Sequence, residues 1–86
     1  MPSTTVSVGS AVGLHARPAT IIAEAATALG APVTLATGGG DPVDAGSALM
    51  IMTLGAEKGA SVTVSSDDQA AVDQIAALVA KDLDAD

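Results

Sequence analysis

The sequence predicts an α+β fold of order βαββαβα, in which three helices pack on one face of a four-stranded antiparallel sheet. Two observations lead to this prediction. Apolar residues recur at every second position in the strand stretches and at helical spacing between them. Each strand is also apolar on one face and rich in Ser and Thr on the other, which suits a sheet with helices on one side and water on the other. A chain of 86 residues without a linker or repeat predicts a single domain over residues 1–86.

The first half of the chain should form one strand, one long loop and one long helix. Thr4–Val8 alternates as a strand does, and Gly9–Leu14 reads as the loop that follows it. The helix should span Ala16–Leu29, because apolar residues recur along it at helical spacing. Pro18 fits the first turn, where its missing N–H costs nothing, and Gly30 ends the helix.

The second half should supply three strands and two helices. The pattern predicts strands over Val33–Thr37, Pro42–Asp44 and Ala60–Ser65, a brief helix over Ala48–Leu54 and a final helix over Asp67–Leu83. The strand at Pro42 belongs at an edge, because proline donates no ladder hydrogen bond. Ser47 can cap the brief helix and Gly55 ends it. Ser66 and Gln69 have the spacing of a capping box for the final helix.

Composition excludes several classes of site. The chain has no aromatic residue, so its core must be built from Val, Ile, Leu, Met and Ala. The absence of Cys excludes disulfides and thiolate metal ligands. With one His and scattered carboxylates, we expect no metal and no cofactor.

The formal charge of −7 leaves only Arg17, Lys58 and Lys81 positive. Nucleic-acid binding depends on clustered Lys and Arg, so we expect no nucleic-acid partner. We also expect no membrane insertion, because no uninterrupted apolar run is long enough to span a bilayer. The N-terminal stretch lacks the basic and then apolar pattern of a secretory signal, which favours a cytoplasmic protein.

His15 and Arg17 are the only residues of their kinds, and both lie where the first helix should begin. The first turn of a helix presents unpaired N–H groups and the positive end of its dipole, so a phosphate binds well there. Neutral histidine is a good nucleophile near physiological pH. The alternative is an exposed or capping histidine beside a solvated arginine. A cation at a helix N-terminus is mildly unfavourable unless an anion is present, which favours the phosphate interpretation.

Three segments carry a resemblance to a known family. Gly13–Thr20 (GLHARPAT) resembles the active-site segment of the HPr family, the histidine phosphocarriers of the bacterial sugar phosphotransferase system. Ser47–Ala56 resembles that family's short second helix and the following turn, and Lys58-Gly59-Ala60 fits the next strand. The resemblance covers nearly all of the chain and implies the family's open-faced sandwich.

The resemblance implies a phosphocarrier rather than an enzyme. His15 would accept a phosphoryl group on Nδ1 from phospho-enzyme I, ultimately from phosphoenolpyruvate, and pass it to a histidine of an enzyme IIA domain. Arg17 would be the charge partner, and the backbone N–H groups of Ala16 and Arg17 would hold the phosphate. We expect a monomer, because a carrier must expose one face to each partner in turn.

The brief helix is expected to form part of the docking face. Its apolar residues cannot all point inward on two turns, so some remain exposed for enzyme I and enzyme IIA, although an ordinary core helix would explain the pattern equally well. The candidate docking residues are Thr20, Leu49, Met50, Met52 and Thr53. Ser47 aligns with a serine that a kinase phosphorylates in some family members, but a cap also explains it fully.

The charges around this face differ from those of many family members, which carry lysines on the first two helices. Glu24 lies on the first helix here, and neither helix has a lysine. Either the partners are less acidic, or association depends more on apolar contact. Two other functions stay open: an HPr-like paralogue in a nitrogen-regulatory or dihydroxyacetone-kinase relay, and a regulatory binding module. No Ser, Cys or metal constellation accompanies His15 to make an autonomous hydrolase.

Overall fold

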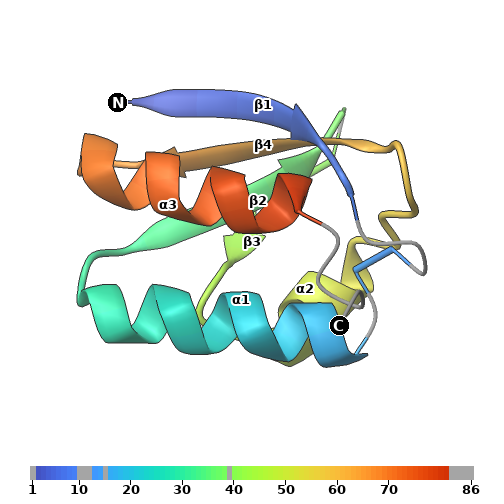
Figure 1. The fold of residues 1–86 in the computed structure, drawn as a ribbon, viewed down its shortest axis with the longest axis horizontal. Helices are drawn as coiled ribbons and strands as arrows, with labels where there is room; N and C mark the ends of the chain where they lie inside the picture. Colours follow the sequence, from blue (N-terminus) through green and yellow to red (C-terminus); the bar gives the residue numbers. More distant parts are fainter. Residues whose placement is uncertain (1, 10–12, 15, 39, 82–86) are drawn as a thin grey trace.

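The computed structural model describes residues 2–9, 13–14, 16–38 and 40–81, and it has the predicted order of elements (Figure 1). The four strands and three helices pack as an open-faced sandwich, with the helices on one side of the sheet. In chain order they are β1 (Ser3–Ser7), α1 (Ala16–Leu29), β2 (Val33–Thr37), β3 (Val43–Asp44), α2 (Ala48–Thr53), β4 (Ser61–Ser66) and α3 (Gln69–Ala80).

The sheet has the order β1-β4-β2-β3, and every neighbouring pair is antiparallel. The register places Val6 opposite Val62, and Val64 opposite Leu35, so that apolar side chains line up on the face towards the helices. The opposite face carries hydroxyls, and the hydroxyls of Thr5 and Thr63 hydrogen-bond across the strands at 2.9 Å. One apolar and one hydroxyl-rich face confirm the alternation on which the fold prediction rested.

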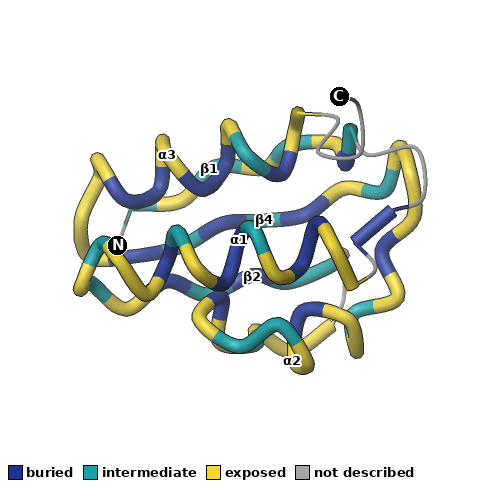
Figure 2. The backbone as a smooth tube through the Cα atoms, turned by 60° about the horizontal axis from the view of Figure 1, so that its bottom comes forward, coloured by how far each residue is buried: buried dark blue, intermediate teal, exposed yellow. Residues whose placement is uncertain are grey.

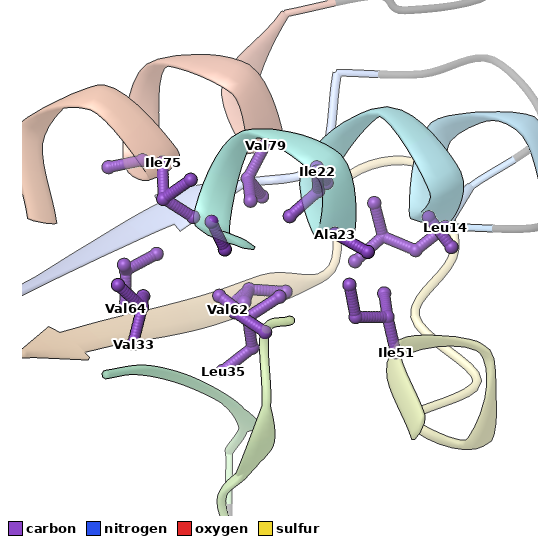
Figure 3. Close-up of a cluster of buried hydrophobic side chains, with 14 of the residues drawn as sticks. Leu14, Ile22, Ala23, Val33, Leu35, Ile51, Val62, Val64, Ile75 and Val79 are labelled. Atoms are coloured by element: carbon purple, nitrogen blue, oxygen red, sulfur yellow. The ribbon is translucent and has the colours of Figure 1, made fainter. Parts of the chain in front are cut away.

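The core lies between the sheet and the helices and is built from small aliphatic side chains (Figure 3). Its largest fully buried members come from all three helices and from the two central strands: Ile22, Leu35, Ile51, Val62, Val64, Val72, Ile75 and Val79. Each such side chain contributes roughly 1.5–3 kcal/mol through burial. The alanines of α1 and α3 complete the packing, which allows these helices to lie close together without a large ring between them.

The predicted start of the last helix is wrong. Asp68 is the N-cap of α3, and its Oδ1 accepts a hydrogen bond from the Ala70 N–H at 3.0 Å. Ser66 instead ends β4 opposite Val33 and is only 2% exposed. The Ser66 hydroxyl donates to the Pro32 carbonyl at 2.6 Å and accepts from the Asp68 N–H at 3.2 Å. Ser66 therefore joins β2, β4 and α3 inside the core. The spacing between Ser66 and Gln69, which predicted a capping box, does not indicate this role.

The predicted end of this helix is also too late. Lys81 has extended backbone angles and caps α3, so the helix ends at Ala80. Leu83, where the sequence placed the end, lies outside the described residues. The strands β1 and β4 are each shifted by one residue from the prediction, although the Val8 N–H still donates to the Ala60 carbonyl at 2.9 Å. Among the helices of the described ranges, none combines the length and apolar character that crossing a bilayer requires.

Candidate functional site

Segments distant in the sequence meet at one end of the molecule, where α1 begins (Figure 1). The Gly59 N–H donates to the Val8 carbonyl at 2.9 Å, which ties the end of β1 to the turn before β4. The Gly9 N–H donates to the Val79 carbonyl at 3.0 Å, which ties the next residue to the last turn of α3. The loop that leads to α1 is therefore anchored at its start on two separate elements.

The same loop is anchored again just before the helix. The Leu14 N–H donates to the Ala56 carbonyl at 2.9 Å, and the Leu14 side chain is 3% exposed. Figure 3 shows Leu14 at the same end of the core as Ile51 of α2. Gly13 has φ +76, and a Cβ there would lie 2.5 Å from the Ala56 carbonyl oxygen, so only glycine fits between the loop and this turn. The two residues before position 15 are thus held against the turn that follows α2.

The first turn of α1 has one buried and one exposed side. Pro18 and Ala19 are buried, whereas Ala16 and Arg17 are exposed. The Thr20 hydroxyl donates to the Ala16 carbonyl at 2.7 Å, which stiffens this turn. The first turn has no acidic residue, and its first N–H groups have no intrahelical acceptor. The N-terminal end of α1 is therefore suited to bind an anion.

His15 lies outside the described residues, so the assignment of its imidazole as the phosphoryl acceptor stays a prediction. Its neighbours in the chain, Leu14 and Ala16, are both described, the first anchored in the core and the second opening α1. The predicted phosphate-holding residues, Ala16 and Arg17, occupy the first two positions of that helix.

Part of α2 is exposed, as its yellow colour in Figure 2 shows, and three of its large apolar residues are exposed as predicted. Ile51 is fully buried, whereas Leu49, Met50 and Met52 are 70%, 42% and 37% exposed. Thr53 is exposed as well, and its hydroxyl donates to the Met50 carbonyl at 2.5 Å. Such an apolar surface on a short helix is a candidate contact for other proteins.

Ser47 caps α2 as predicted. Its backbone is extended, and its hydroxyl oxygen accepts a hydrogen bond from the Met50 N–H at 3.3 Å. The cap accounts for a hydroxyl-bearing residue at this position without any modification.

A groove of about 480 Å³ lies between α1 and the start of α2. Thr20, one of the predicted docking residues, lines it from α1, and Ala48 lines it from α2. Of the candidate docking residues, only Thr20 lines this groove, and those of α2 do not. Helical spacing alone could not reveal the groove, because it depends on how the two helices pack.

The three basic residues of the chain come from segments that meet at this same end. Arg17 lies in the first turn of α1, Lys58 in the turn before β4, and Lys81 directly after α3. The sequence alone did not predict this arrangement, because the three residues are far apart in the chain and the order of the strands brings their segments together. Within the described ranges, no three His, Cys, Asp or Glu side chains come together in a way that could hold a metal ion.

Comparisons with known proteins point in one direction. The sequence model of the family described as "PTS HPr component phosphorylation site" matches residues 2–81. The chain is 49% identical over 82 residues to the phosphocarrier protein HPr of Streptomyces coelicolor, covering 92% of this chain and 88% of that protein.

Solved structures agree with the sequence comparison. The structure is similar to that of a phosphocarrier protein HPr from Bacillus anthracis, with a TM-score of 0.83 and 28% identity, covering 91% of this chain and 95% of that one. It is also similar to HPr-C-His from Thermoanaerobacter tengcongensis, with a TM-score of 0.82 and 28% identity, over 92% and 91% of the two chains.

Proposed function

The chain belongs to the HPr family of phosphocarrier proteins of the phosphotransferase system, and from this premise we propose that His15 carries the phosphoryl group. It receives this group from phospho-enzyme I, ultimately from phosphoenolpyruvate, and donates it to a histidine of an enzyme IIA domain during sugar uptake. The chain acts in the cytoplasm. It is a carrier rather than an enzyme, because its own imidazole first accepts and then donates the phosphoryl group. The observation that supports this most directly is the anchored loop that ends at the exposed start of α1.

The transfer is an in-line displacement at phosphorus. The lone pair of His15 Nδ1 forms a bond to the phosphorus while the bond from phosphorus to the donor imidazole nitrogen breaks. The electron pair of the broken bond returns to that donor nitrogen. Transfer to enzyme IIA is the same step with His15 as the leaving group. Neither step requires an oxidant or a cofactor.

The charge on the phosphoryl oxygens is balanced at the start of α1. The backbone N–H groups of Ala16 and Arg17 point towards the helix N-terminus, and Pro18 supplies none. The Arg17 guanidinium adds a charged donor suited to phosphate. An anion at a helix N-terminus gains about 0.3–1 kcal/mol from the dipole, and up to about 2 kcal/mol where it is partly buried. This gain is modest, which suits a carrier that must also release the group.

Enzyme I and enzyme IIA dock in turn on the exposed residues of α1 and α2. The apolar residues of α2 provide contact area, and methionine side chains adapt to more than one partner. The contacts should be small and short-lived, because the carrier must leave each partner quickly. The docking residues are Thr20, Leu49, Met50, Met52 and Thr53.

Intact-protein mass spectrometry tests this function. The chain is incubated with phosphoenolpyruvate, magnesium and enzyme I from the same genome, and in parallel His15→Ala is treated identically. We expect the wild-type chain to gain one acid-labile phosphoryl group and the variant to gain none. If His15→Ala is phosphorylated as well as the wild type, the site is wrong. If neither gains a phosphoryl group while enzyme I itself becomes phosphorylated, the chain serves another relay or acts as a binding module.

A further inference from the structure

Thr20 lies on the exposed side of α1, where neither core packing nor helix propensity explains a threonine. Threonine forms helices less readily than alanine, which α1 has at many of its other positions. The Thr20 hydroxyl donates to the Ala16 carbonyl at 2.7 Å. A hydrogen bond of this kind, to the carbonyl four residues earlier, slightly destabilises a helix. The contact therefore calls for an explanation other than the stability of α1.

The Ala16 carbonyl belongs to the same peptide group as the Arg17 N–H. This group is planar and trans, like every peptide bond in the described ranges, so its carbonyl and its N–H point in opposite directions. The carbonyl points along the helix to Thr20, and the N–H points out of the N-terminal end of α1. The Thr20 hydroxyl thus holds one side of a peptide group whose other side is predicted to bind the phosphate.

A hydrogen bond accepted by a peptide carbonyl also changes the N–H of the same group. It fixes the plane of the group, and it draws electron density from the nitrogen, so that the N–H becomes a stronger donor. Hydrogen bonds linked in this way strengthen one another by about 10–30% per bond. The effect is largest where the acceptor is charged, as phosphoryl oxygens are, because such bonds are roughly twice as strong as neutral ones. Loss of the Thr20 hydroxyl should therefore weaken the Arg17 N–H as a donor without removing it.

We propose that Thr20 is a positioning residue for phosphoryl transfer, whose hydroxyl orients and polarises the peptide group between Ala16 and Arg17 for binding the phosphoryl oxygens. This inference rests on the proposed function, because it assumes that the Arg17 N–H holds the phosphoryl group. The role is distinct from contact with partner proteins. Docking changes how fast the group is transferred, whereas a bond to the phosphoryl oxygens also changes how stable the phosphorylated chain is.

The equilibrium constant of phosphoryl transfer from phospho-enzyme I to the chain separates these two roles. It compares the free proteins before and after transfer, so contacts that exist only within the complex do not enter it. Known amounts of phospho-enzyme I and chain are mixed without free phosphoenolpyruvate, and the phosphorylated fraction of the chain is measured by mass spectrometry in alkaline solution. We expect Thr20→Val and Thr20→Ala each to lower this constant about threefold.

Two further variants are controls. Thr20→Ser keeps the hydroxyl and should retain the wild-type equilibrium constant. Thr27→Val makes the same change as Thr20→Val seven residues further along the exposed side of α1, and it should also retain that constant. Thr20→Ala strengthens the helix, so a purely structural role of Thr20 predicts no loss in this variant. Helical circular dichroism verifies that each variant is folded.

The NMR signal of the Arg17 amide proton gives an independent measurement. Phosphorylation should move this signal downfield in the wild-type chain and less far in Thr20→Val. A slower transfer with an unchanged equilibrium constant in Thr20→Val would overturn the proposal, because Thr20 would then act through docking alone. An equal loss in Thr20→Ser would overturn it as well, since the hydroxyl would not be the cause. Failure of the wild-type chain to accept any phosphoryl group would instead overturn the proposed function.

Discussion

Replacing Gly13 by alanine should destabilise the protein far more than the same change at a comparable glycine. Gly13 has φ +76, a conformation that costs an L-residue about 1–2 kcal/mol. A Cβ would also lie 2.5 Å from the Ala56 carbonyl oxygen and 2.8 Å from the Glu57 Cα, both of them backbone atoms. Neither atom can move aside as the end of a side chain could, so the loop itself must shift.

That shift breaks contacts whose contributions can be estimated separately. The hydrogen bond from the Leu14 N–H to the Ala56 carbonyl, 2.9 Å long, contributes about 1 kcal/mol. Leu14 is 3% exposed, and its burial contributes roughly 1.5–3 kcal/mol, of which a displaced loop loses a part. Together with the backbone cost, we expect Gly13→Ala to lower the free energy of unfolding by about 3–5 kcal/mol, a large share of the stability of a small domain.

Gly55→Ala is the matched control. Gly55 has φ +63, but a Cβ there meets no atom within 4 Å, so only the backbone cost of about 1–2 kcal/mol applies. Both variants are unfolded with urea. Since the chain has no aromatic residue, helical circular dichroism replaces fluorescence as the signal. Equal losses of stability in the two variants would refute the claim that close packing against Ala56 restricts position 13.

Two further predictions concern single side chains whose burial differs sharply. Ser66→Ala should lower the free energy of unfolding by about 1–3 kcal/mol, because the Pro32 carbonyl and the Asp68 N–H both lose a hydrogen-bond partner. The control Ser65→Ala should change the free energy of unfolding by less than about 0.5 kcal/mol. Urea unfolding checks this pair, and a similar effect at both positions would contradict the role assigned to Ser66. Leu49→Ala should leave stability within about 0.5 kcal/mol but slow phosphoryl transfer from enzyme I, whereas the buried Ile51→Ala should cost about 2–5 kcal/mol. An unchanged transfer rate in Leu49→Ala would remove this residue from the docking face.

The elements that local chemistry defines were predicted well. The bounds of α1 agree with the prediction at both ends, because Pro18 marks the first turn and Gly30 follows the last residue. The Ser47 cap of α2 was likewise predictable from one hydroxyl residue before an apolar run. In such places the signal and the structure that it causes lie within a few residues of each other.

The predictions were wrong or incomplete where a structural feature depends on residues that are distant in the sequence. Ser66 carries a capping signal, but its pairing opposite Val33 turns its hydroxyl into the core, so that Asp68 caps the helix instead. The contact of Gly13 with Ala56 and the groove between the two helices depend on tertiary packing. Gly13, two residues before His15, was the one local sign of a close backbone approach.

The topology also determines when during synthesis the proposed phosphorylation site can form. The N-terminal strand β1 pairs with β4, and the loop before α1 is held by residues 56 and 59 and by the end of α3. A chain that emerges from the ribosome N-terminus first therefore presents the histidine segment early, but it lacks the distant backbone contacts that anchor the loop before α1. The contacts become available only after residues 56, 59 and 79 have been made. A product of translation that stops before these residues would thus carry His15, the proposed phosphoryl acceptor, without the contacts that anchor the loop before α1.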